Sequence, residues 1–292
     1  MSDAHRAVLS ELLQAPLHKL QPLGGGDICQ AWSVHDHHGQ TWFAKHHPRE
    51  PCGMFTLEAE GLEVLRRTAP KGLHIPAVQH ATPPGAPSAW LVLEWVAPAR
   101  STAASDASLG HGLAMMHRAP PPTVPSENWL GPLKQHNHPP PSASDWPAFW
   151  WTQRLEPRLR AIAATRPLPV ALHRRLKALP ERLPMLLSTD EPMSLLHGDL
   201  WSGNRLTTGH GRPCLNDPAV CIGHREVDLA MMHLFGGFDE TCWRAYHNVW
   251  PLKPGFERRR AAYQMYYLLV HVELFGAGYW SNVSSALDQL GL

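Results

Sequence analysis

The sequence has little of what defines several large classes of protein. Only 17% of its 292 residues are charged and 43% are hydrophobic, which is typical of a folded globular protein and fits neither disorder nor a coiled coil. The formal net charge is only +1, whereas a nucleic-acid-binding surface needs a basic patch or stripe. We therefore expect a globular protein, either one bilobal unit or two domains, that does not bind nucleic acid.

The sequence also lacks paired cysteines and long apolar runs. Its five cysteines are scattered, without a Cys-x-x-Cys pair, so neither a disulfide framework nor a zinc site is indicated and a reducing cytoplasm is favoured. The N-terminal residues contain no apolar signal core, and no run approaches the ~18 apolar residues of a membrane span. These absences predict a soluble cytoplasmic protein without a membrane partner.

Twenty histidines raise the alternative of a metal site, above all at His35-Asp36-His37-His38 and His46-His47. Adjacent residues on a strand point to opposite faces, so His46 and His47 cannot converge on one ion. The first group sits beside Gly39 in a predicted hairpin turn. Solvated polar turns are the better interpretation of both groups.

One stretch carries the chemistry, His197-Gly198-Asp199-Leu200-Trp201-Ser202-Gly203-Asn204. Leu195 and Leu196 predict a short buried strand that ends at His197-Gly198, so Asp199 is expected on a rigid loop. Asp199 and Asn204 keep the spacing of a kinase catalytic loop, in which the aspartate accepts the substrate hydroxyl proton and the asparagine binds magnesium.

A second acid follows a predicted β-hairpin. Arg205-Leu206-Thr207-Thr208 and Pro213-Cys214-Leu215 flank a Gly209-His210-Gly211 turn, which would return Asp217 to the side of Asn204. Magnesium prefers oxygen ligands and usually takes only one or two from the protein. Asn204 and Asp217 are therefore the predicted magnesium ligands.

The N-terminal part offers a lysine and a helix. Thr41-Trp42-Phe43-Ala44-Lys45 predicts a strand ending in one lysine, which a kinase uses to hold the α- and β-phosphates. A predicted helix from Met54 to Arg67 could supply the ion-pair partner of this lysine. The candidates on that helix are Glu58, Glu60 and Glu63.

Two further segments match a nucleotide site more loosely. Leu23-Gly24-Gly25-Gly26-Asp27-Ile28 lies at a predicted hairpin tip where the backbone could approach a phosphate, although it is neither Gly-x-Gly-x-x-Gly nor a Walker A loop. The last small-lobe strands are predicted at 75–78 and 89–96. The second of them ends at Glu94-Trp95-Val96 before Pro98, which has the form of a kinase hinge whose backbone would bind adenine.

Helical spacing predicts most of the remaining chain. Helices are expected over 8–13, 109–117, 150–164, 171–187, 225–233, 263–275 and 283–290. Proline runs at 120–122 and 139–141 bracket a loop-rich insertion. In the 225–233 helix and just after it, Asp228 is expected to hold the catalytic loop by hydrogen bonds, and Met231, Met232, Leu234 and Phe235 are expected in the core.

These motifs closely resemble the fructosamine kinase (ketosamine 3-kinase) family, above all in the 197–204 stretch, in Asp217-Pro218-Ala219 and in Arg225-Glu226-Val227-Asp228-Leu229-Ala230. The resemblance implies an α+β, bilobal, protein-kinase-like fold. A small antiparallel sheet with one helix would form a nucleotide-binding lobe at 1–96, and a larger, mostly α-helical lobe at 97–292 would hold the catalytic and substrate sites.

The resemblance also implies a function and its residues. The family phosphorylates the sugar of glycated amines, here a small-molecule or protein-bound ketosamine, with ATP and Mg²⁺, and its Glu-Ala-x-x-Leu pattern selects Glu58 as the partner of Lys45. The implied roles are catalysis by Asp199, nucleotide binding by Gly24, Gly25, Gly26, Lys45, Glu58, Glu94, Trp95 and Val96, metal binding by Asn204 and Asp217, substrate binding by Trp201, and structural support by His197 and Asp228.

Several points stay open at this stage. Asp27, Asn216 and His224 depart from the family pattern, and segments 131–137 and 146–154 resemble part of a substrate lid. Trp201 could instead be a core residue. The competing functions are an aminoglycoside or amino-alcohol phosphotransferase and an inactive nucleotide-binding protein. A hydrolase built on Ser202, His197 and Asp199 would need a Gly-x-Ser-x-Gly elbow, which the sequence lacks. A monomer is favoured over an oligomer.

Overall fold

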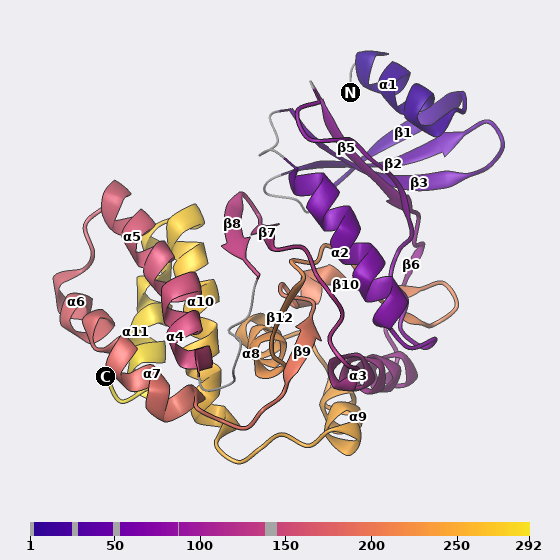
Figure 1. Ribbon diagram of the computed structural model, residues 1–292. Helices are drawn as coiled ribbons and strands as arrows, with labels where there is room; N and C mark the ends of the chain where they lie inside the picture. Colours follow the sequence, from indigo (N-terminus) through magenta and orange to yellow (C-terminus); the bar gives the residue numbers. More distant parts are fainter. Residues whose placement is uncertain (1–2, 25–28, 49–52, 87, 138–144) are drawn as a thin grey trace.

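The computed structural model describes residues 3–24, 29–48, 53–86, 88–137 and 145–292 (Figure 1). A five-stranded antiparallel sheet with helix α2 forms the N-terminal part, and helices dominate the C-terminal part. The predicted α+β fold with two unequal parts is therefore confirmed. Among the helices in these ranges, none combines the length and the hydrophobicity that a membrane crossing requires.

The N-terminal sheet has the strand order β1-β2-β3-β5-β4, and every neighbouring pair is antiparallel. The strand β3 runs two residues past Lys45, which therefore lies inside the strand and not at its end as predicted. The strand β2 includes His35, so the turn at Gly39 is shorter than expected. The bounds are β1 Leu17–Leu23, β2 Gln30–Asp36, β3 Thr41–His47, β4 Val78–Ala81 and β5 Ala89–Glu94.

The two faces of this sheet bury different helices. The helix α1 (Asp3–Leu13) covers the face of Val34, Ala44 and Val92, whereas α2 (Met54–Thr68) packs Phe55 and Leu62 against Leu91 on the other face. Successive strand residues alternate between faces, and Lys45 pairs with Leu91 in register. Lys45 consequently faces α2.

The prediction of a strand at 75–78 was wrong, since β4 begins only at Val78. The backbone of His74 instead pairs with the C-terminal part, where its N–H donates to Pro213 O at 2.8 Å and its C=O accepts from Leu215 N at 3.0 Å. Pro76 then has no N–H to offer to a sheet. This segment therefore joins the two parts before the last strands of the N-terminal sheet.

Two small sheets in the C-terminal part position the loops of interest. The strands β9 (Met193–Leu196) and β12 (Cys221–His224) pair antiparallel. The predicted hairpin is confirmed as β10 (Arg205–Thr208) and β11 (Pro213–Leu215), and β10 also pairs with β6 (Pro98–Ala99). Both sheets place a loop that follows a buried strand at the junction of the two parts.

Most helices of the C-terminal part pack around α10, which is buried along most of its length, whereas α3 and α9 pack against each other. The helix predicted at 171–187 is two helices that divide at Ala178, where Pro180 starts the second one. The helix predicted at 109–117 begins earlier, because Thr102 and Ser105 form a capping box. Figure 1 shows these elements: α3 Ala103–Arg118, α4 Trp146–Trp150, a π-helical turn Trp151–Leu155, α5 Glu156–Thr165, α6 Val170–Lys177, α7 Leu179–Leu187, α8 Glu226–Phe235, α9 Glu240–Val249, α10 Phe256–Phe275 and α11 Trp280–Gln289.

The insertion predicted to be rich in loops contains a β-hairpin, β7 (Glu127–Leu130) and β8 (Leu133–His136). Its buried amides explain its position. The side chains of Asn128 and Asn137 both donate to Val220 O, at 2.7 and 2.9 Å, and Gln135 Oε1 accepts from Tyr266 OH at 2.8 Å. The hairpin is thus fixed to the segment that follows Asp217, while residues 138–144 of the insertion lie outside the described residues.

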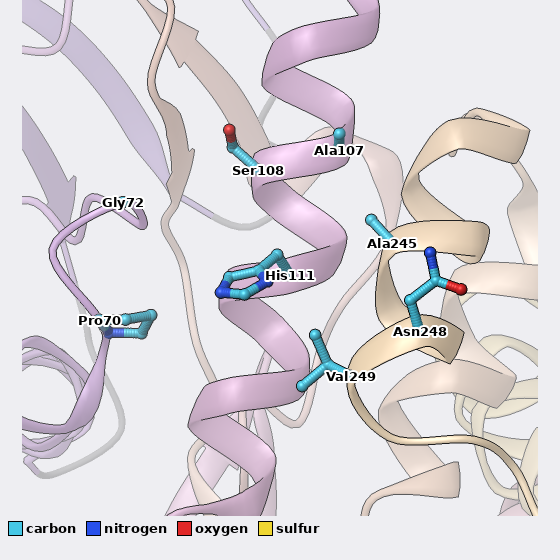
Figure 2. A pocket seen from close by; sticks show the side chains of 9 residues that line it. Pro70, Gly72, Ala107, Ser108, His111, Ala245, Asn248 and Val249 are labelled. Carbon is cyan, nitrogen blue, oxygen red and sulfur yellow. The ribbon is translucent and has the colours of Figure 1, made fainter.

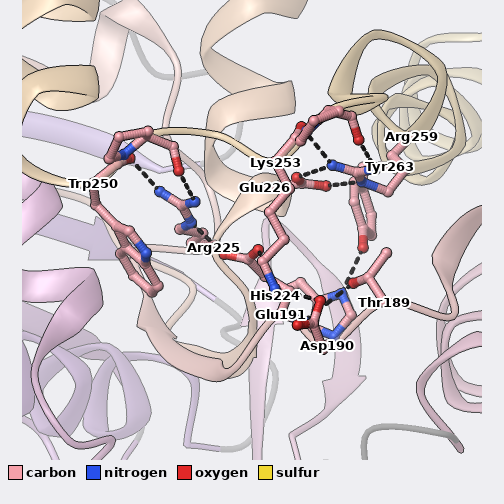
Figure 3. Close-up of polar contacts among 12 residues, drawn as sticks. Thr189, Asp190, Glu191, His224, Arg225, Glu226, Trp250, Lys253, Arg259 and Tyr263 are labelled. Carbon is pink, nitrogen blue, oxygen red and sulfur yellow. Dashed lines mark hydrogen bonds and ion pairs between the residues drawn. The ribbon is translucent and has the colours of Figure 1, made fainter.

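The start of α8 is held by buried ion pairs, shown in Figure 3. Arg225 donates to Glu191 Oε1 at 2.5 Å and to the carbonyls of Trp250 and Pro251, and its guanidinium lies 3.8 Å from the centre of a Trp250 ring. Glu226 accepts from Arg259 at 2.6 and 2.7 Å. These contacts fix the 250–255 loop against α8.

Replacing Arg225 by Met should lower the free energy of unfolding by about 3–5 kcal/mol, because the buried Glu191 carboxylate would lose its hydrogen-bonded partner and keep only Lys253 at 3.9 Å. The control is Arg160→Met, which breaks an exposed i,i+4 ion pair with Glu156. This substitution should change the free energy of unfolding by at most about 1 kcal/mol. Urea unfolding of the two variants and the wild type measures both effects. Equal losses would contradict this account of the α8 ion pairs.

Candidate active site

The loop after β9 is held by one buried carboxylate. Asp228, in the first turn of α8, accepts from His197 N at 2.7 Å and from Gly198 N at 2.8 Å, so the hydrogen bonds predicted between it and the loop are present. Gly198 has φ +82°, and a Cβ there would lie 1.9 Å from Ala219 O. Only glycine can therefore occupy this position. Its constrained backbone leads directly into Asp199, the next residue.

His197 links the two predicted catalytic loops. Its ring is buried, and burial lowers its pKa, so the imidazole is neutral. Nε2 lies 3.0 Å from Asn216 O, and Nδ1 lies 3.4 Å from Asp199 N. A carbonyl only accepts and an amide N–H only donates, so Nε2 carries the proton and Nδ1 is the acceptor.

The structure brings Asp199 and Asn204 together. Asn204 Nδ2 donates to Asp199 O at 2.9 Å and to Asp199 Oδ2 at 3.0 Å. Burial, together with the charge of Asp217, raises the pKa of Asp199 to about 7. The carboxylate can therefore exchange a proton near neutral pH, which suits a general base.

Asp217 follows β11 and lies on the same side as Asn204. Its φ of +58° is in the left-handed region, which aspartate tolerates better than most residues. Asn216 N donates to Asn204 O at 3.0 Å, and Asn204 Nδ2 lies 3.3 Å from Asp217 O. The hairpin therefore returns Asp217 to Asn204, as its spacing predicts, with 47% of the Asp217 side chain exposed.

Lys45 joins the sheet to this loop. Its Nζ lies 2.8 Å from Glu58 Oε1 and 2.5 Å from Asp217 Oδ1. Burial disfavours the charged lysine, but the Asp217 and Glu58 carboxylates outweigh it and raise the pKa of Lys45 well above its usual value. The pairing with Glu58 is confirmed over the alternative Glu63, which binds Arg66 at 2.9 Å.

The remaining predicted nucleotide residues are only partly placed. Trp95 and Val96 follow the end of β5 without regular structure. The Glu94 carboxylate bonds Ala77 N at 3.1 Å and His74 Nε2 at 3.0 Å, which fixes the start of this segment. Gly24 lies just after β1, whereas Gly25, Gly26 and Asp27 lie outside the described residues.

Trp201 lies at the surface, so the core alternative for this residue is contradicted. Its side chain is 40% exposed, and its ring meets Phe235 edge to face at a centroid distance of 6.4 Å. Phe235 is 41% exposed, although it was expected in the core. It is the last residue of α8, so helical periodicity could not place it reliably.

Two residues that support the catalytic loop were not predicted. His117 Nε2 lies 3.2 Å from Asp228 Oδ2, and its Nδ1 lies 2.8 Å from Tyr246 OH. Tyr267 OH donates to Gly198 O at 2.8 Å. Both rings come from buried helix faces, and sequence spacing alone does not distinguish them from other core residues.

Two other features lie apart from these residues. His224, one of the departures from the family pattern, is buried with its ring centre 4.7 Å from that of Trp146, and its Nδ1 lies 2.9 Å from Tyr263 OH.

Figure 2 shows a hollow between α3, α9 and the loop after α2, lined among others by Pro70, His111 and Val249. The predicted site residues are not among those that line it.

Known proteins resemble the whole chain. The fructosamine kinase family model matches residues 1–292. A probable ketoamine kinase of Enterococcus faecium is 34% identical over 276 residues, 92% of this chain and 94% of that protein. The chloroplastic protein-ribulosamine 3-kinase of Arabidopsis thaliana is 31% identical over 286 residues, 96% and 85% of the two chains. The crystal structure of a Thermobifida fusca protein named as a fructosamine-3-kinase has a TM-score of 0.86 at 31% identity and covers 99% of both chains.

Replacing Gly198 by Ala should destabilise the protein far more than Gly39→Ala. Both glycines have positive φ, at +82° and +84°, but a Cβ at Gly39 would meet nothing within 4 Å. The control should therefore cost about 1–2 kcal/mol of backbone strain, and Gly198→Ala should add the collision with Ala219 O. Urea unfolding compares the two, and similar losses would show that the close approach at Gly198 does not constrain the loop.

Proposed function

Because the chain belongs to the fructosamine kinase family, we propose that it transfers the γ-phosphoryl group of ATP to a sugar hydroxyl of a ketosamine. The observation that carries this proposal is the convergence of Lys45, Asp199, Asn204 and Asp217 from segments far apart in the sequence. The aminoglycoside alternative is not favoured, because the family match and the curated relatives are ketoamine and ribulosamine kinases.

Lys45 would hold the nucleotide phosphates. It remains charged because two carboxylates flank it, and Glu58 fixes its position from α2. A phosphate entering beside Lys45 would share or replace the contact with Asp217. The backbone at Trp95 and Val96 would bind the adenine, and the glycine segment that begins at Gly24 would lie over the phosphates.

Asp199 would orient the sugar hydroxyl and accept its proton as the phosphorus–oxygen bond forms. Its pKa of about 7 allows this near neutral pH, and the hydrogen bond from Asn204 holds the carboxylate in place. Trp201, two residues further on, would form one wall of the acceptor site. Most of the rate increase would come from positioning and charge stabilisation.

Magnesium is the metal that fits the donor set. Asp217 offers a half-exposed carboxylate and Asn204 an amide oxygen, and hard oxygen ligands in this number are what Mg²⁺ accepts from proteins. When bound with ATP, the ion would neutralise the charge that develops on the phosphates. The cytoplasmic location and the monomeric state remain predictions.

A substrate panel with ATP, followed by ADP release, tests this function. Fructosyl- or ribulosyl-lysine should be phosphorylated far better than free fructose or kanamycin, because only a ketosamine offers both a sugar and a cationic amine to the acceptor site. Equal or better turnover of kanamycin would contradict the substrate class and leave the kinase in place. No ADP release with any acceptor would contradict both.

Replacing Asp199 by Asn should lower kcat by about 10²–10⁴-fold, because the amide cannot accept the proton. In the wild type, kcat/KM should fall as the pH drops through about 7, where Asp199 becomes protonated. The variant's residual activity should lack this dependence. Near-normal turnover of the variant, or the same pH profile in both proteins, would contradict the assignment of Asp199 as the general base.

A further inference from the structure

Five rings form a continuous row that starts at the catalytic loop. We call Trp201, Phe235, His271, Phe275 and Tyr279 the aromatic row. Trp201 meets Phe235 at 6.4 Å between ring centres, and Phe235 meets His271 at 4.9 Å. His271 meets Phe275 at 5.4 Å and Tyr279 at 4.9 Å. Each spacing lies within the range of interacting aromatic pairs.

The direction of the aromatic row is set by α10. Tyr267, His271 and Phe275 are four residues apart and share one face of this helix. Tyr267 donates to the carbonyl of Gly198, directly before Asp199, and is buried. His271, one turn on, is half-buried, and Phe275, two turns on, is 49% exposed. This face of α10 therefore runs from the backbone of the catalytic loop out to the surface, where the aromatic row lies.

The side of the aromatic row nearest the loop is held rigidly. Gly237, two residues after Phe235, has φ +84°, and a Cβ there would lie 2.5 Å from Ser202 Cβ. Gly203 lies equally close to the Trp201 ring, because a Cβ added to Gly203 would lie 2.3 Å from Trp201 Cη2. Phe235 and Trp201 are thus fixed against the same loop as Asp199.

The exposed aromatic side chains of the described residues are concentrated in the aromatic row, which indicates a binding surface. Among the described residues, six large hydrophobic side chains are exposed, and the three aromatic ones are Trp201, Phe235 and Phe275. All three lie in the aromatic row, so the exposed aromatic surface is concentrated at one place. Contiguous exposed apolar surface of this kind usually binds something.

We propose that the aromatic row binds the amine portion of the ketosamine, and that the enzyme prefers amines carrying an aromatic or large apolar group. This rests on the proposed function. The proposed function places the sugar hydroxyl at Asp199, so the amine attached to the same sugar lies near the loop and can extend along the surface where Trp201 begins the row. A cationic secondary amine fits over Trp201, and its apolar substituent then reaches Phe235 and Phe275.

The chemistry of the aromatic row suits such a ligand. His271 Nδ1 lies 2.7 Å from the carbonyl oxygen of Tyr267, to which it donates. Burial lowers the pKa of His271, so the ring is neutral at pH 7 and does not repel a cationic amine. The row is therefore uncharged along its length.

The test compares fructosyl-phenylalanine with fructosyl-alanine, which differ only by the phenyl ring. With ATP, the wild type should show a kcat/KM about fivefold to tenfold higher for fructosyl-phenylalanine, mostly through a lower KM. Phe235→Ala and Phe275→Ala should each reduce this ratio at least about twofold, and Phe235→Tyr should retain it. Met185→Ala, which removes another exposed apolar side chain from α7, should leave the ratio at the wild-type value.

The outcomes separate the two claims. A wild-type ratio near one, or a ratio unchanged in both alanine variants, overturns the role of the aromatic row while the kinase assignment stands. Failure of the wild type to phosphorylate either compound overturns the proposed function, and this inference with it. Thermal melting of each variant checks folding, and the half-exposed Phe275 provides a second variant if Phe235→Ala unfolds.

Discussion

The ion pair between Lys45 and Asp217 is the interaction on which the site depends. It joins β3 of the N-terminal sheet to the loop after β11, 172 residues later in the chain. Lys45 is nearly buried, so an unpaired ammonium there would be costly, and the two carboxylates that flank it keep it charged. Placing this charge at the junction of the two parts brings together the groups that we propose bind phosphate and exchange the proton.

The opposite side of the site depends on Asp228. This carboxylate accepts from two successive backbone amides before Asp199, and His117 contacts it from α3. Tyr267 of α10 donates to the carbonyl of Gly198, which follows both amides. Side chains from three helices therefore fix the backbone of His197 and Gly198 through two N–H groups and one carbonyl, and this sets the position of Asp199. Such support is what precise positioning for phosphoryl transfer requires.

The sequence could predict the features that local spacing determines. The β10–β11 hairpin and the α2 helix follow from strand alternation, turn residues and helical spacing, whereas the choice of Glu58 as the partner of Lys45 came from the family resemblance; the structure contains all three. The hydrogen bonds from the loop after β9 to the Asp228 side chain were also expected. The hairpin and the helix need only a few neighbouring residues to be specified.

The features that were missed depend on contacts between distant segments. His74 pairs with β11 instead of starting a strand of the N-terminal sheet, which no property of the 75–78 segment reveals. The β7–β8 hairpin is stabilised by Asn128 and Asn137 bonding the carbonyl of Val220, a partner more than eighty residues away. Phe235 is exposed because α8 ends there beside Trp201. Tertiary packing overrides the local pattern in all three cases.

Calorimetry of nucleotide binding tests the central claim most directly, which is that Lys45 and Asp217 together form the site for magnesium and ATP. The wild type should bind ATP with Mg²⁺ present and much more weakly with EDTA, and Asp217→Ala should lose this magnesium-dependent part, because Asn204 alone cannot replace a charged ligand. Glu63→Ala, which removes a surface carboxylate from α2, is the matched control and should bind as the wild type does. Unchanged affinity for ATP and magnesium in a folded Asp217→Ala protein would contradict the account.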